Sequence, residues 1–292
     1  MVFDYKKLLD WRFDDIEQTY SARDTILYAL GLGYGSKPTD KSELRFVYEE
    51  KLLALPMMAV VLGYPGFWLK NERTGVDWKT VLHGEQGVIV HRPLPPSGTV
   101  IGKSRVTKIL DKGEKGSLLF SERDVLDKKS GALLATLRQT AVLRGNGNYG
   151  GPTSAAPEPH RLPDRTPDTV VDINTLPQAA LIYRLSGDYN PLHADPQVAN
   201  SAGFDRPILH GLCTFGVAGR AILRACCGND PSRLKEIHAR FSSPVFPGET
   251  ISTEIWCDEE IISFRARTHE RNQLVLNNGH ASIDCLPSRL NH

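Results

Sequence analysis

The sequence predicts an α+β protein with two units of similar size, each built from an antiparallel sheet and helices. Apolar and polar residues alternate over four segments in each half, which is typical of half-buried strands. A long helical segment, from about Gly211 to Cys227, precedes the strands of the second half. Glycine and proline are concentrated at residues 146–167, a composition that usually links domains. We therefore expect a first unit over residues 1–145, a linker, and a second unit over residues 168–292.

The expected elements follow in chain order. A helical stretch runs from Ser21 to Leu30, and the small residues of the 211–227 segment favour close packing of that helix on a sheet. Tight turns are expected at Lys112-Gly113 and at Asn277-Asn278-Gly279, because glycine and asparagine tolerate turn geometry. Alternation predicts strands at residues 87–91, 99–109, 117–126, 133–143, 238–242, 250–258, 261–268 and 273–283.

Composition excludes several classes of function. The chain has 292 residues, 40% of them hydrophobic, which is enough for a substantial core. Its net charge of +1 gives no reason to expect nucleic acid or an acidic membrane surface as a partner. Five cysteines lack metal-type spacing, and the adjacent Cys226 and Cys227 are poorly placed to pair with each other. We expect reduced thiols and no metal.

Targeting signals are not evident in the sequence. The uncharged run from Leu52 to Leu69 contains Pro56 and Pro65, which break the helix that a membrane span would need, so it predicts buried core. The first residues lack the order of a signal peptide. The last three, Leu290-Asn291-His292, differ from a Ser-Lys-Leu peroxisomal address. We expect a cytoplasmic protein, or a peroxisomal one if the source is eukaryotic.

A degenerate repeat relates the two halves. Tyr28-Ala29-Leu30 aligns with Tyr183-Arg184-Leu185 at an offset of 155 residues. At this offset Gly33 corresponds to Asp188, Gly35 to Asn190 and Pro38 to His193, so the first half lacks the polar set of the second. The glycines at 31, 33 and 35 follow a helical stretch and lack dinucleotide-loop spacing, which argues against a nucleotide site.

The strongest functional signal is the segment Asp188-Tyr189-Asn190-Pro191-Leu192-His193, followed by Leu209-His210-Gly211. Pro191 disfavours helical geometry at Asn190, so the segment should be a fixed loop. In such a loop the carboxylate of Asp188 and the imidazole of His193 can converge on one small molecule for acid/base chemistry. Asp195-Pro196 instead reads as a helix N-cap with proline at the first helical position.

These residues resemble a known family. The run from Tyr183 to His193, with Pro207–Leu212 and Phe241–Thr250, resembles the hydratase 2 motif of MaoC-like dehydratases. Leu82-His83-Gly84-Glu85-Gln86 and Leu110-Asp111-Lys112-Gly113 resemble the first half of two-domain hydratase 2 enzymes, so the resemblance covers nearly the whole chain. It implies a double hot-dog fold, two antiparallel sheets each wrapped around a helix. It also implies (R)-specific hydration of trans-2-enoyl-CoA to (3R)-3-hydroxyacyl-CoA in fatty-acid metabolism.

The resemblance also implies roles for single residues. Asp188 and His193 would share acid/base work in an order that the sequence leaves open, with Asn190 as an orienting partner. Gly211, at a helix start, would offer its N–H to the oxyanion. The implied CoA and acyl contacts are His83, Gly84, Lys112 and Phe241. CoA belongs to the substrate, no separate cofactor is expected, and the family resemblance implies a homodimer.

Other interpretations stay open at this stage. The same residues suit dehydration of a 3-hydroxyacyl group on acyl carrier protein or on another CoA ester. A non-catalytic acyl-CoA-binding module and a thioesterase are further alternatives. The run from Ala54 to Phe67 is either the wall of an acyl tunnel or plain core.

Overall fold

The computed structural model describes residues 3–284. Expectations for the N-terminal Met1 and Val2 and the C-terminal Leu290-Asn291-His292 lie outside the described residues. The first half contains α1 (Tyr5–Leu9), β1 (Ile16–Tyr20), α2 (Ala22–Gly31), α3 (Lys41–Leu44), the 3-10 helices η1 (Pro56–Val61), η2 (Trp68–Lys70), η3 (Glu72–Thr74) and η4 (Trp78–Thr80), β2 (Val81–Val90), β3 (Gly98–Asp111), η5 (Gly113–Lys115), β4 (Ser117–Asp127) and β5 (Leu133–Leu143). The second half contains β6 (Thr169–Asn174), α4 (Ala179–Tyr183), η6 (Arg184–Ser186), η7 (Pro191–His193), α5 (Pro196–Ser201), α6 (Gly211–Cys226), η8 (Pro231–Arg233), β7 (Leu234–Phe241), β8 (Thr250–Asp258), β9 (Ile261–Thr268) and β10 (Leu274–Ile283).

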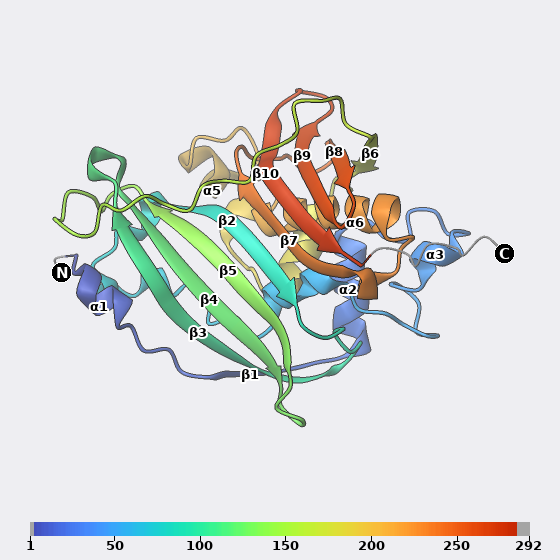
Figure 1. The fold of residues 1–292 in the computed structure, drawn as a ribbon, viewed down its shortest axis with the longest axis horizontal. Coiled ribbons are helices and arrows are strands. Elements are labelled where there is room, and N and C mark those ends of the chain that lie inside the picture. Colours follow the sequence, from blue (N-terminus) through green and yellow to red (C-terminus); the bar gives the residue numbers. More distant parts are fainter. Residues whose placement is uncertain (1–2, 285–292) are drawn as a thin grey trace.

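All ten strands of the described chain form one antiparallel sheet, in the order β1-β3-β4-β5-β2-β7-β10-β9-β8-β6 (Figure 1). The halves meet where β2 pairs with β7, from Glu85 opposite Arg240 to Ile89 opposite Glu236. The order reads symmetrically from this seam outward, with β1 corresponding to β6 and β3 to β8. This symmetry agrees with the degenerate repeat seen in the sequence.

A charged side-chain pair crosses the seam. Arg240 donates from Nε and Nη2 to Oε1 of Glu85, at 2.9 and 2.7 Å, and the Thr140 hydroxyl donates to Oε2 of the same carboxylate at 2.8 Å. The two Arg240 donors on Oε1 fix the orientation of the Glu85 carboxylate, and the Thr140 hydroxyl satisfies its Oε2. The pair therefore ties β2 to β7 in addition to the strand ladder.

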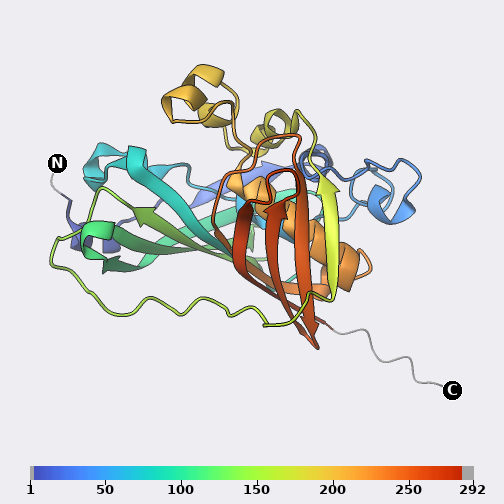
Figure 2. The ribbon, with the colours of Figure 1, turned by 90° about the horizontal axis from the view of Figure 1, so that it is seen from above.

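The second-half sheet curves around α6, as expected for a hot-dog fold (Figures 1 and 2). Eleven consecutive residues of this helix, from Cys213 to Leu223, are buried. Its glycines admit side chains from the first half: a Cβ at Gly216 would lie 2.7 Å from Leu32, and one at Gly219 would lie 2.7 Å from Met57. The small residues thus serve contacts with the other half, in addition to the sheet packing expected from the sequence.

In the first half, the six-residue helix η1 packs against β2, β5 and α6. It starts at Pro56, and the chain leaves helical geometry at Leu62, just before Gly63, so proline and glycine limit its length. Met57 and Met58 are fully buried, which confirms core for this part of the run, whereas Tyr64 and Phe67 further along it are exposed. Met58, Val61 and Leu62 also line a cavity of about 150 Å³.

The strand predictions were largely confirmed, with three corrections. β1 and β6 were not predicted. β2 and β7 begin at Val81 and Leu234, earlier than the predicted starts at residues 87 and 238. The turn expected at Asn277-Asn278-Gly279 is wrong, because these residues lie inside β10 at a register shift. Asn278 has a φ of 51°, and a Cβ at Gly279 would lie 2.7 Å from the Phe264 ring, so a β-bulge uses the residues that a turn would use.

The linker at residues 146–167 has no helix or strand and runs along the outside of the molecule toward β6 (Figure 2). It is nonetheless held to the second half. His160 Nε2 lies 2.7 Å from the Ser263 hydroxyl, and Trp256 Nε1 donates to the Arg165 carbonyl at 2.7 Å. The exact domain limits stay a prediction. No helix within residues 3–284 has the length and apolar character to cross a membrane.

Candidate active site

The Asp188–His193 segment begins as the expected loop, but it ends in the short 3-10 helix η7 where only a loop was expected, because proline is tolerated at a first helical position, here Pro191. The Asn190 backbone N–H donates to Asp188 Oδ1 at 3.2 Å. The Asn190 side chain accepts from Leu192 N at 3.1 Å and so caps η7. Asn190 therefore contacts Asp188 through its backbone, and its side-chain oxygen shapes the loop. Asp195 caps α5 in the same way, which confirms its structural role.

His193 is buried at the end of this loop. Its Nδ1 lies 2.9 Å from the Ile208 carbonyl oxygen. A carbonyl only accepts, so Nδ1 carries the proton and Nε2 keeps a free lone pair. Burial lowers the pKa of His193 below its ordinary value, although the Ile208 carbonyl and Asp188 oppose this effect. The ring is therefore neutral near pH 7, and Nε2 is available to accept a proton.

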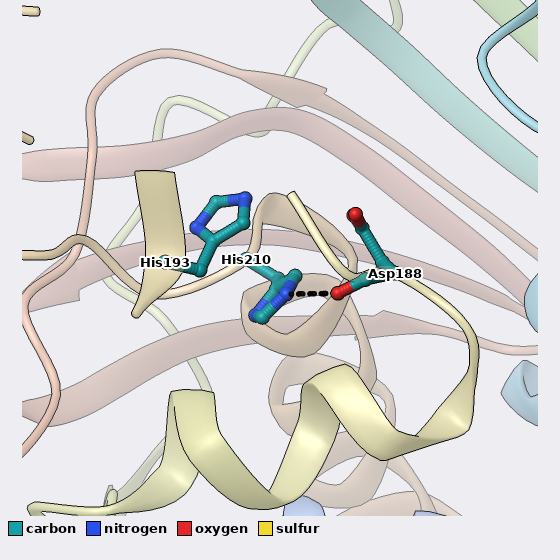
Figure 3. Close-up of side chains that lie close together, drawn as sticks. All are labelled: Asp188, His193 and His210. Carbon is teal, nitrogen blue, oxygen red and sulfur yellow. Dashed lines mark hydrogen bonds between the residues drawn. The ribbon is translucent and has the colours of Figure 1, made fainter. Parts of the chain in front are cut away.

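His210 completes the cluster, and sequence reasoning gave it no role. Its ring stacks on His193 with 3.7 Å between centroids, and its Nε2 donates to the backbone carbonyl of Asp188 at 3.1 Å (Figure 3). Burial, and then the neighbouring His193, lower the pKa of His210 to about 4. The sequence offered one signal for His210: it is the N-cap residue of α6, a position where serine or aspartate is usual.

Gly211 follows as the first residue of α6, where a backbone N–H has no acceptor within the helix. A Cβ at this position would lie 3.2 Å from the Phe241 ring, so that ring faces the helix start closely. The His83 ring lies 4.7 Å from Phe241, centroid to centroid. Burial lowers the pKa of His83 to about 4, and Asp188 is near enough to oppose the shift.

The other expected binding residues differ in placement. Gly84 lies at a register shift of β2, where a Cβ would meet the Thr140 carbonyl at 3.1 Å. Lys112 belongs to the connection between β3 and β4. This connection lies at the end of the first-half sheet that is remote from α6 in both views (Figures 1 and 2). The structure thus gathers Asp188, His193, Gly211, His83 and Phe241 at one site, and leaves Lys112 apart from them.

Asp188, His193 and His210 each offer one ligand atom within 4.8 Å of the others. Two imidazoles and a carboxylate form a donor set that suits a divalent transition metal. The same set also suits proton transfer without a metal, because the His193 Nε2 lone pair faces the site together with a carboxylate. The absence of a metal stays an expectation.

Comparison with known proteins places this geometry in a family. Residues 159–278 match the model described as MaoC like domain, and residues 18–145 match the MFE-2 hydratase 2 N-terminal domain. The peroxisomal enoyl-CoA hydratase 2 of Arabidopsis thaliana is 39% identical over 311 residues, covering 99% of this chain and 98% of the relative. The chain belongs to the MaoC-like hydratase 2 family.

Other family members agree. The 3-hydroxyacyl-thioester dehydratase Y of Mycobacterium tuberculosis is 43% identical over 246 residues, covering 82% of this chain and 83% of the relative. A MaoC-like dehydratase from Phytophthora capsici superposes with a TM-score of 0.86 at 38% identity, over 97% of this chain and 100% of that structure. A Mycobacterium tuberculosis protein described as a double hotdog fold superposes with a TM-score of 0.55 at 15% identity, which supports the fold alone. The predicted family and fold class are confirmed.

Proposed function

We propose that this hydratase 2 family member adds water across the double bond of a trans-2-enoyl-CoA thioester, giving the (3R)-3-hydroxyacyl-CoA, and catalyses the reverse dehydration. One observation carries the proposal. A neutral imidazole with a free Nε2 lone pair, a carboxylate loop and an unpaired helix N–H lie together at the start of α6. These are the three groups that hydration of a conjugated thioester needs.

The proposed mechanism assigns each group a step. The Gly211 N–H donates to the thioester oxygen, where negative charge develops as water adds, and one such donor typically contributes about 3 kcal/mol. The oxygen of water forms a bond to C3 while Asp188 and His193 take one of its protons. The pair returns one proton to C2, so both groups regain their starting protonation. The reaction consumes only water and the thioester, and it needs no redox cofactor.

The acyl chain has a candidate location. The cavity of about 150 Å³ is lined by Leu185, Ser186 and Gly187, the three residues before Asp188, and by parts of β1, α2 and η1. The first-half part of this lining supports the proposal that the first half shapes the acyl site. We propose that the acyl tail enters this cavity and that His83 and Phe241 contact the thioester side of CoA. Gly84 would allow close approach there, and Lys112 would act only on a distant part of CoA.

Dehydration of a 3-hydroxyacyl group on acyl carrier protein or on another CoA ester is the second candidate, supported by the 43% identity to a relative named 3-hydroxyacyl-thioester dehydratase. It uses the same residues in reverse. Acyl carrier protein and CoA substrates are distinguished by offering the same acyl group on each carrier and comparing kcat/KM.

Assembly and location are further proposals. The outer edges at β1 and β6 each pair on one side only within the described chain, which supports a homodimer. Light scattering coupled to gel filtration tests it. Four cysteines of the described chain are free thiols, which supports a reducing compartment such as the cytoplasm, to be checked by cell fractionation.

The decisive assay offers crotonyl-CoA and trans-2-decenoyl-CoA separately and follows loss of the enoyl absorbance. Coupling to (R)- or (S)-specific hydroxyacyl dehydrogenases reports the product configuration, and a signal through the (R) enzyme alone is expected. Asp188→Asn and His193→Ala should each lower kcat by at least about 10²-fold. The exposed controls Asp14→Asn and His269→Gln should keep wild-type turnover. Near-native activity in either site variant would sink the proposal.

A further inference from the structure

His210 makes contacts that a space-filling residue would not need. Its ring is 1% exposed, lies flat against His193, and donates to the backbone carbonyl of Asp188. It also immediately precedes Gly211 at the start of α6. One side chain thus contacts both acid/base residues and adjoins the oxyanion donor (Figure 3).

We infer that His210 is a positioning residue, which holds Asp188, His193 and the N–H of Gly211 in one rigid frame. The inference rests on the proposed function for the reaction that this frame serves. The contact to Asp188 is made at the backbone carbonyl, so it fixes the loop without occupying the carboxylate, whose Oδ1 accepts from the Asn190 N–H. The stacked His210 ring limits rotation of the His193 ring, whose Nδ1 already donates to the Ile208 carbonyl.

The chemistry of His210 argues against a merely structural role. Its Nδ1 is buried and finds no hydrogen-bond partner in the described chain, and leaving a buried polar atom unpaired is destabilising. A phenylalanine would fill the same space without that cost. Histidine at residue 210 is therefore less stabilising than phenylalanine would be, but its ring both stacks on His193 and donates a hydrogen bond.

The surroundings of His210 keep its ring neutral. It faces His193, Asp188, the charge of Arg184 and the Tyr183 ring, whose centroid lies 5.1 Å away. A protonated His210 would place a cation against His193 and oppose proton uptake there. Neutral His210 also covers one face of His193 and shields it from water, which contributes to the lowered pKa of His193.

Three variants separate the two contacts. His210→Phe keeps a flat ring and loses the donor, His210→Gln keeps a donor at similar reach and loses the stack, and His210→Ala loses both. We expect kcat to fall by ~10²-fold in the alanine variant with KM little changed, and by less in the other two, because small misplacements of reacting groups are that costly. His238→Gln, a partly buried histidine outside the site, is the matched control and should keep kcat.

A second readout needs no substrate. Imidazole C–H signals of the nine histidines are titrated by NMR, with His193 assigned from its loss in His193→Gln. The His193 pKa should rise toward 6.5 in the alanine and glutamine variants, where the ring is uncovered, and stay low in His210→Phe. The acid limb of kcat/KM should move with it.

The outcomes are separable. An unchanged His193 titration in all three variants, or a loss of kcat that follows thermal stability alone, overturns the positioning role. If the wild-type protein hydrates no enoyl thioester, the proposed function fails. The titration still tests the contact between His210 and His193 in that case.

Discussion

Replacing Arg220 tests how α6 is held to the first half. Arg220 Nη2 donates to both carboxylate oxygens of Glu43, at 2.7 and 2.9 Å, with the two side chains 5% and 4% exposed. Nη1 donates to the Leu32 carbonyl at 3.0 Å, and the guanidinium lies 4.6 Å from the Tyr34 ring centroid. Arg220→Met would leave the Glu43 charge buried without a partner.

The magnitude follows from that loss. Breaking a buried pair by removing one partner costs about 3–5 kcal/mol, whereas replacing both partners by apolar residues is often nearly neutral. We therefore expect Arg220→Met to lower the free energy of unfolding by about 3–5 kcal/mol. The double variant Arg220→Met with Glu43→Met should recover most of it. A remainder of about 1 kcal/mol should persist, because the Leu32 carbonyl has lost its donor in both variants.

Urea unfolding of the wild type, both single variants and the double variant completes a thermodynamic cycle. The reasoning is refuted if Arg220→Met costs less than 1 kcal/mol, or if the double variant loses as much as the two single variants together. Glu254→Gln serves as control, because the Glu254 carboxylate pairs with Arg265 at a more exposed site, and its effect should be small.

Three further predictions concern pH and two glycines. The folded pKa of His210, about 4, lies below the ordinary value of 6.5, so the unfolded chain binds more protons between these values. Stability should therefore fall as the pH drops from about 6.5 toward 4, by up to about 3 kcal/mol from this residue, and an unchanged slope in His210→Gln would contradict this. Gly211→Ala should keep the melting temperature but impair kcat/KM by roughly 10-fold, since its Cβ would press on Phe241; wild-type kinetics would disprove the contact. Gly63 has a φ of 58°, and its Cβ would lie 2.6 Å from Gly102 Cα, so Gly63→Ala should destabilise more than Gly66→Ala, which has open space; equal unfolding midpoints would count against the clash.

The sequence predicted elements best where one pattern dominates. β5, β8 and β9 were predicted with the observed limits, because long alternation is bounded by turn residues on both sides. β1 and β6 have only five and six residues at the sheet edges, which is too short for alternation to stand out. The bulge in β10 was read as a turn because both need asparagine and glycine.

At the candidate active site too, the sequence revealed residues that share a local motif and missed a residue whose contacts depend on the tertiary structure. Asp188 and His193 are five residues apart, so a local motif revealed them. His210 acts over 22 residues through a stacked ring and one hydrogen bond to a backbone carbonyl, and its role depends on how the loop folds back onto α6. The placement of Lys112 likewise depends on tertiary structure, because the turn that carries it looks the same wherever the hairpin points.

The seam between β2 and β7 joins two hot-dog halves within one polypeptide. Without this seam, two identical chains would have to associate to bring two such halves together. In a symmetric pair of identical hot dogs, every substitution appears twice, once beside each catalytic centre. Here a substitution in the first half appears once, and the residues aligned with Asp188 and His193 are already Gly33 and Pro38. Selection can therefore alter the first-half lining of the cavity that we propose for the acyl chain, while Asp188 and His193 in the second half stay unchanged.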